Sequence, residues 1–150
     1  MKPFIFPLER IRRYKTQLLD KEKATLARLR KNKDEIATHI ASLEAFRRDE
    51  SQKFTEKQQQ GITAQEISSH HFYMSNTRHQ LEELAVLLEK AKEEVARQLK
   101  IVIALSQEIS GLDKLEEKQL TEYRLEEARQ NELQTSEHLS TALSRQKQAR

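Results

Sequence analysis

The stretch KQQQGITAQEI, residues 57–67, contains one of only two glycines in the 150-residue chain, and the sequence on both sides resembles charged helix. Gly61 stands where a helix needs a left-handed residue to end. Thr63 and Glu66 have the spacing of a capping box, in which each side chain satisfies a free backbone N–H at a helix start. The stretch therefore predicts a helix end, a turn at residues 60–63 and a new helix, rather than a flexible linker between two domains.

Ile62 and Ile67 flank this cap at the spacing of a hydrophobic staple, which sets the direction in which the chain enters the helix. Because the connection is short, the two helices should be antiparallel neighbours. We therefore expect an all-α fold and a single domain over residues 1–150. Helix one (about 5–59) and helix two (about 64–140, followed by a frayed tail) should form an antiparallel coiled-coil hairpin.

Composition favours a helical hairpin over a compact domain. The chain has 2 Gly, 2 Pro and no Cys, and it is 34% charged and 36% hydrophobic. This apolar fraction can cover a stripe along a helix but cannot fill a broad core. The absence of cysteine excludes a disulfide scaffold and a thiolate zinc site. No apolar run approaches the roughly 18 residues of a membrane span, so we expect a soluble protein without membrane insertion.

The second half carries a regular seven-residue apolar repeat, which is the spacing of a coiled-coil seam. Its members are Ile67, Met74, Leu81, Leu88, Val95, Val102 and Ile109. Gly111 follows in the same frame, and we favour a helix that continues through it, because one glycine does not by itself end a helix. The alternative is a break with a new cap at Ser110 or Asp113.

The first half is less regular than the second. One seven-residue frame contains Leu8, Ile11, Leu18, Leu29, Ile36, Leu43 and Phe46. Polar residues interrupt it at Lys15, Glu22, Thr25, Asn32 and His39. Leu19, Leu26 and Ile40 lie one position to the side of this frame. Polar residues in a seam fix the register of the helices at some cost in stability.

No sequence motif indicates catalysis or a cofactor. The chain lacks a glycine-rich phosphate loop and a catalytic triad pattern, and His70, His71 and His79 lack the i, i+4 spacing of a helical metal site. We therefore predict that the protein is not an enzyme and has no cofactor and no metal.

Basic residues are concentrated in the first helix, where residues 1–60 hold 15 Lys/Arg against 9 Asp/Glu. Acidic residues interleave with them and no aromatic platform accompanies them, so we predict no nucleic-acid binding. The basic residues favour an acidic protein surface as the partner or serve only solubility. The segment HHFYM places Phe72 and Tyr73 on neighbouring faces soon after the turn. An exposed aromatic there is a candidate docking point; packing on Phe54 across the turn is the alternative.

The opening segment FIFPLERIRRYKTQLLDKEKATLARL resembles the start of the flagellar export protein FliJ family. The length, the bend near residue 60, the aromatic segment after it and the charged second helix resemble the same family. The resemblance implies a cytoplasmic coiled coil similar to the central stalk of rotary ATP synthases, peripheral at the inner face of the cell membrane. Its implied partners are the hexameric flagellar export ATPase, the membrane export gate protein and export chaperones.

The resemblance also implies two sets of partner-binding residues. The export gate would bind a patch that starts at an aromatic residue, here Phe72 or Tyr73, and continues through Thr77 and Gln80. Thr77 departs from the apolar residue usual in the family at that place. The paired ends would enter the ATPase ring, with contacts from Phe4, Phe6, Leu8, Arg12 and Arg13. The alternatives are a structural coiled-coil scaffold or homodimer, and the stalk protein of a virulence type III secretion system.

Overall fold

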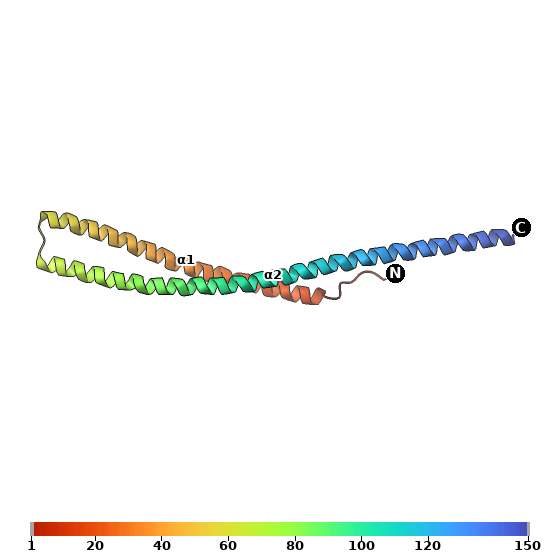
Figure 1. Cartoon of the computed structure of the whole chain (residues 1–150), viewed down its shortest axis with the longest axis horizontal. Helices are drawn as coiled ribbons and strands as arrows, with labels where there is room; N and C mark the ends of the chain where they lie inside the picture. The colour runs from red at the N-terminus through yellow and green to blue at the C-terminus, as the bar shows by residue number, and fades with distance from the viewer. Residues whose placement is uncertain (1, 150) are drawn as a thin grey trace. The chain divides into compact units, whose positions relative to one another are not determined.

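The computed structural model describes residues 2–149. It consists of two helices, α1 (Glu9–Gln60) and α2 (Ala64–Gln148), joined by a short turn (Figure 1). No strand occurs among the described residues. The two long helices pack against each other as a hairpin, so the predicted all-α fold is confirmed.

Both helices differ from the expected bounds at the ends far from the turn. α1 begins at Glu9, and not near residue 5, because Pro7 disfavours a helical conformation at the residue before it. α2 remains helical through Gln148, beyond the fraying expected after about residue 140. Its last turns are rich in Ala, Leu, Gln and Arg, which lose little side-chain entropy in a helix. α2 also runs through Gly111 without a break, as favoured from the sequence.

The contacts of the chain fall into two units. One comprises the residues up to Leu19 together with those from Ala104 onward, and the other comprises Asp20–Ile103, including the turn. The single-domain organisation expected from the sequence stays a prediction.

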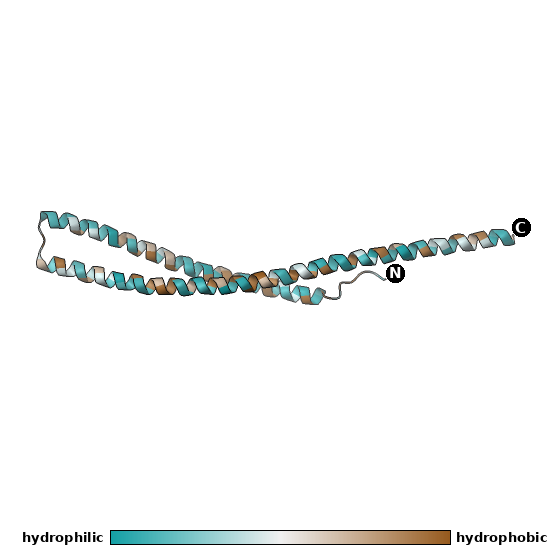
Figure 2. Cartoon of the chain, viewed as in Figure 1, coloured by the Kyte–Doolittle hydropathy of each residue, from teal (hydrophilic) through white to brown (hydrophobic). Residues whose placement is uncertain are grey.

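The core of each unit is a thin seam, because two helices cannot enclose a broad interior. Within the described residues, the buried apolar side chains are Phe6, Leu26, Ala91, Val102 and Leu105. The predicted α2 frame is confirmed, since every member from Ile67 to Ile109 is at least half-buried. Apolar residues recur along both helices between longer polar stretches (Figure 2). Most stabilisation therefore comes from many partly buried side chains rather than from a closed core.

The predicted α1 frame is corrected by the structure. In the unit that contains the turn, buried and half-buried α1 residues recur at alternating steps of four and three: Glu22, Leu26, Leu29, Lys33, Ile36, Ile40, Leu43, Arg47, Glu50 and Phe54. Leu26 and Ile40, which lay beside the predicted frame, belong to the seam, whereas Phe46 is 51% exposed. Lys33 is half-buried, as a long charged side chain can be when its apolar stem packs against a neighbouring helix.

Candidate partner-binding surfaces

The turn is built by Gly61 and Thr63. Gly61 has a φ of 105°, in the region that L-residues rarely adopt. The hydroxyl oxygen of Thr63 accepts a hydrogen bond from the backbone N–H of Glu66 (3.2 Å), and the Thr63 carbonyl accepts one from the N–H of Ile67 (3.1 Å). Thr63 is therefore the N-cap of α2, as its spacing from Glu66 predicts. Ile62 and Ile67 are both half-buried.

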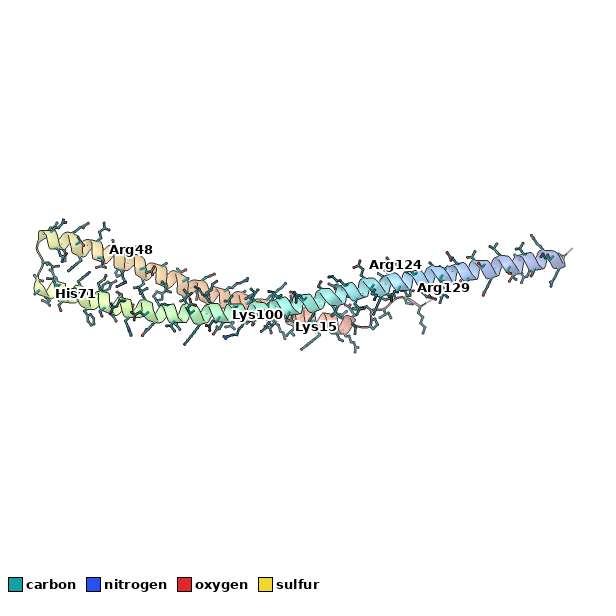
Figure 3. The ribbon with its side chains drawn as sticks, viewed as in Figure 1. Lys15, Arg48, His71, Lys100, Arg124 and Arg129 are labelled. Carbon is teal, nitrogen blue, oxygen red and sulfur yellow. The ribbon has the colours of Figure 1, made fainter. Side chains whose placement is uncertain are left out.

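Two aromatic contacts join α1 to α2 near the turn. The rings of Phe54 and His70 are stacked with centroids 3.7 Å apart and an interplanar angle of 2°. The edge of one ring meets the face of the other between Phe46 and Tyr73, with centroids 5.8 Å apart. Phe54 therefore packs on His70, and neither Phe72 nor Tyr73 is its stacking partner. His71 and Arg48 lie on α2 and α1 in the same part of the hairpin (Figure 3).

The four residues predicted to bind the export gate lie on two faces of α2. Phe72 is 75% exposed, and Gln80 is also exposed. Tyr73 is half-buried, and Thr77 is only 4% exposed. Because successive helical residues are rotated by about 100°, Phe72 points outward while Tyr73 turns toward α1.

Thr77 is held by an arginine on the opposite helix. The Arg47 Nε–H donates to the Thr77 hydroxyl oxygen (2.9 Å), and a terminal guanidinium N–H of Arg47 donates to the Met74 carbonyl (3.3 Å). The Thr77 hydroxyl lies 2.9 Å from the Tyr73 carbonyl, to which it donates its own proton. A buried hydroxyl in a seam is thus fully paired, as burial requires.

Tyr73 carries a polar group whose hydrogen-bonding capacity is unsatisfied. Its hydroxyl is buried and has no hydrogen-bond partner among the described residues. Burial raises the pKa of Tyr73 above its ordinary value of 10.0, and the nearby Glu50 carboxylate raises this pKa further, while Arg47 lowers it. The ring of Tyr73 therefore serves packing more than hydrogen bonding.

The residues predicted to bind the ATPase ring lie in the unit formed by the N-terminal segment and the later part of α2. Phe6 is 6% exposed, Leu8 is half-buried, and the Phe4 ring lies 5.6 Å from that of Tyr123 on α2. The side chain of Arg13, in contrast, is 72% exposed. The three apolar residues therefore hold the segment on α2. Arg13 pairs with Glu9 at 3.9 Å and is otherwise open to solvent or a partner.

Arg12 is the centre of a charged cluster in this unit. Its guanidinium lies 5.1 Å from the Phe6 ring centroid and pairs with the carboxylates of Glu9, Asp113 and Glu116. The hydrogen bond with Glu116, opposed by partial burial, holds the pKa of Arg12 well above its usual value. Lys15 adds an ion pair with Glu108 at 2.6 Å. These contacts fix the first turns of α1 on α2.

Several exposed apolar residues were not predicted as candidates. In the N-terminal segment and the start of α1, Ile5 is 77% and Tyr14 is 65% exposed. In the last third of α2, exposed leucines occur at Leu125, Leu133, Leu139 and Leu143. Sparse leucines in a polar helix give a weak periodic signal, so the sequence did not distinguish them from the seam.

Basic residues also gather on the exposed part of α1. Lys21, Lys23, Arg28, Arg30 and Lys31 are all exposed. The one acidic residue among them, Glu22, faces the seam, where its carbonyl accepts a hydrogen bond from the Gln98 side chain (3.0 Å). The outward surface of this stretch is therefore positive.

Two kinds of feature are absent from the part of the chain that the structure describes. No group of three or more His, Cys, Asp or Glu residues is arranged there to hold a metal ion. Neither α1 nor α2 contains a segment apolar enough over a sufficient length to span the hydrocarbon region of a bilayer.

Comparison with protein families matches residues 4–148 to the model of the flagellar FliJ protein. The chain belongs to the FliJ family. The match covers nearly the whole of this chain and confirms its resemblance to the family. It supports a role as a component of the flagellar export apparatus. Searches of curated proteins and of solved structures found no significant match.

Proposed function

We propose that this FliJ-family chain acts by binding rather than by catalysis, as a stalk-like coiled coil in the cytoplasm at the inner face of the cell membrane. Its partners are the hexameric flagellar export ATPase, the membrane export gate and export chaperones. The observation that carries the proposal is the capped hairpin turn followed, within a few turns of α2, by the exposed Phe72. A large aromatic side chain that is 75% exposed is a typical anchor of a protein interface.

The gate would bind the outward face of α2 around Phe72. Residues three, four, seven and eleven positions apart share a helical face, and the residues at these steps from Phe72, all exposed, are Ser75, Asn76, His79 and Glu83. His79 and Glu83 lie 3.3 Å apart, and Gln80 borders the same face. Tyr73 and Thr77 belong to this surface as its support beneath, because their side chains face α1.

The gate interface is tested by Phe72→Ala, with Leu125→Ala as the matched control. Leu125 is another large apolar residue, 67% exposed, far along α2 from Phe72. We expect Phe72→Ala to weaken binding to the cytoplasmic domain of the gate by about thirtyfold, which is the loss of a hot spot of about 2 kcal/mol. Leu125→Ala should leave gate binding unchanged. Equal affinities of the wild type and Phe72→Ala for the gate domain would exclude this surface.

The ATPase ring would bind the unit that holds the N-terminal segment. Phe4, Phe6, Leu8 and Arg12 keep the segment on α2, and the exposed side chains of Arg13, Ile5 and Tyr14 are available to the ring. The exposed guanidinium of Arg13 favours acidic side chains on the ring, and attraction of this kind weakens at high salt.

The ring interface is tested by co-purification with the export ATPase and by its rate of ATP hydrolysis. The wild-type chain should bind and stimulate hydrolysis, and Arg13→Glu should reduce both effects. Arg48→Glu, a charge reversal at an exposed residue near the turn, should reduce neither. If the wild-type chain neither binds the ATPase nor stimulates it, the stalk proposal is wrong.

The second candidate function is a scaffold that pairs with another copy of itself. The four exposed leucines of the last third of α2 favour it, because large apolar side chains are left exposed there. Multi-angle light scattering separates the two functions. A stable dimer that persists in the presence of the ATPase supports the scaffold, and a monomer supports the stalk.

A further inference from the structure

We propose that Arg47 is a positioning residue for the gate-binding face: it holds residues 73–77 of α2 in one rotation about the helix axis and so directs Phe72 outward. The inference rests on the proposed function of the Phe72 face. Arg47 lies on the other helix and belongs to the seam, so it acts on the partner only through α2.

Arg47 occupies a place where a coiled-coil seam normally has an apolar side chain. Its seam neighbours on either side include Ile40, Leu43 and Phe54. An apolar side chain packs well over a range of helix rotations, since dispersion contacts have little directionality. A guanidinium instead has donors in a rigid planar arrangement, so its hydrogen bonds are satisfied in few orientations. A seam arginine therefore specifies geometry where an apolar residue would chiefly supply stability.

The two acceptors of Arg47 lie on one turn of α2. The Nε–H meets the Thr77 hydroxyl at 2.9 Å, and a terminal N–H meets the Met74 carbonyl at 3.3 Å. Two bonds to points three residues apart fix both the rotation and the axial position of that turn. A one-residue shift of the seam would rotate α2 by about 100° and turn Phe72 away from its present direction.

Thr77 extends this constraint to the residue beside Phe72. Its single hydroxyl proton is donated to the Tyr73 carbonyl (2.9 Å), while its oxygen accepts from Arg47. Thr77 is 4% exposed, so water does not replace either bond. Phe46, next to Arg47 on α1, contacts the Tyr73 ring at 5.8 Å. Two adjacent α1 residues therefore hold the turn of α2 that presents Phe72.

The first test separates positioning from stability with Arg47→Met. Methionine keeps the length of the side chain and removes every donor, and an apolar seam residue should leave Tm unchanged or raise it. We expect the affinity for the gate domain to fall about tenfold all the same, with partial recovery in Arg47→Lys. Arg48→Met, which removes an exposed charge next to Arg47, is the matched control and should bind like the wild type. A loss of affinity that only parallels a fall in Tm indicates a structural role and overturns the proposal.

The second test needs no partner. Because the chain has no cysteine, spin labels placed by Ala45→Cys and His79→Cys report one distance between the two helices. We expect a narrow distance distribution in the otherwise wild-type chain and a broader or shifted one in Arg47→Met. Thr77→Val, which keeps the side-chain shape and loses the hydroxyl, should have the same effect. It provides the distance measurement if Arg47→Met does not fold. An unchanged distribution in both variants overturns the proposal.

The outcomes of the two tests distinguish this inference from the proposed function. If the distances change but Phe72→Ala still binds the gate domain normally, the proposed gate face is wrong while the positioning role of Arg47 stands. If Phe72→Ala loses binding but neither Arg47→Met nor Thr77→Val changes affinity or distance, the gate face stands and the positioning role is wrong.

Discussion

The two glycines of the chain have opposite backbone conformations, so the same substitution should change stability in opposite directions. Gly61 follows α1 with a φ of 105°, whereas Gly111 lies inside α2. A Cβ atom at either position meets no other atom within 4 Å. Steric clashes with neighbours therefore play no part, and the difference reflects backbone conformation alone.

The magnitudes follow from the two conformations. Gly61→Ala places an L-residue in a sparsely populated region, at a cost of about 1–3 kcal/mol. The lower entropy of the unfolded alanine chain offsets about 0.4–1 kcal/mol of this. The free energy of unfolding should therefore fall by about 1–2 kcal/mol. Gly111→Ala should raise it by about 1 kcal/mol, the difference in helix propensity between the two residues.

Urea denaturation followed by far-ultraviolet circular dichroism measures both changes, and thermal melts give a second reading. For a chain of this size, 1 kcal/mol corresponds to about 2–4 °C in Tm. If Gly61→Ala stabilises the protein as Gly111→Ala should, the turn does not hold Gly61 at positive φ and our account of the hairpin is wrong. A loss of stability in Gly111→Ala would show that α2 is not a regular helix at that point.

Three further substitutions test the cap, the buried hydroxyl and the seam by the same denaturation assay. Thr63→Ala should lower the free energy of unfolding by about 1 kcal/mol because α2 loses its N-cap, whereas Thr121→Ala, inside α2, should not lower it. Tyr73→Phe should raise it by up to about 1 kcal/mol near neutral pH, since the hydroxyl is buried without a partner. Because the pKa of Tyr73 is raised in the folded protein, the unfolded chain loses the phenol proton at a lower pH, near the ordinary pKa of 10.0. The wild type should therefore lose stability as pH rises from there through the folded pKa. Tyr73→Phe, which has no ionisable group at this position, should lose less. Leu105→Ala, at a buried seam position, should lower the free energy of unfolding by about 2 kcal/mol. Leu143→Ala, on the exposed end of α2, should change it by less than about 0.5 kcal/mol. A lower free energy of unfolding in Tyr73→Phe than in the wild type would contradict these assignments, and so would equal effects of Leu105→Ala and Leu143→Ala.

Local signals in the sequence were sufficient for the turn and for one of the two seams. Gly61 and the Thr63–Glu66 spacing act through backbone conformation and a cap bond that span only a few residues. The α2 repeat from Ile67 to Ile109 is apolar at each step, so its inward face follows from periodicity alone. These features depend on neighbours in the sequence, and for this reason they were predictable.

The α1 seam was only partly predictable in the same way. Glu22 lay in the predicted frame, but the seam also includes Lys33, Arg47 and Glu50, which read as solvent-facing residues when apolar periodicity is the criterion. Two of the polar seam residues have partners on α2: Gln98 for Glu22, and Thr77 with the Met74 carbonyl for Arg47. A hydrogen bond between residues far apart in the sequence leaves no periodic signal in either helix.

The sequence by itself determined three things about this protein: that it has two long helices, that the chain reverses at Gly61, and that it belongs to the FliJ family. Only the tertiary structure decided which side chains of the predicted sites remain available to partners. Phe72 and Arg13 point outward, whereas Thr77, Phe6 and Arg12 are used to hold one helix on the other. The physical reason is that exposure depends on how each helix is rotated toward its neighbour. In a polar seam that rotation is set by hydrogen bonds and ion pairs across the hairpin.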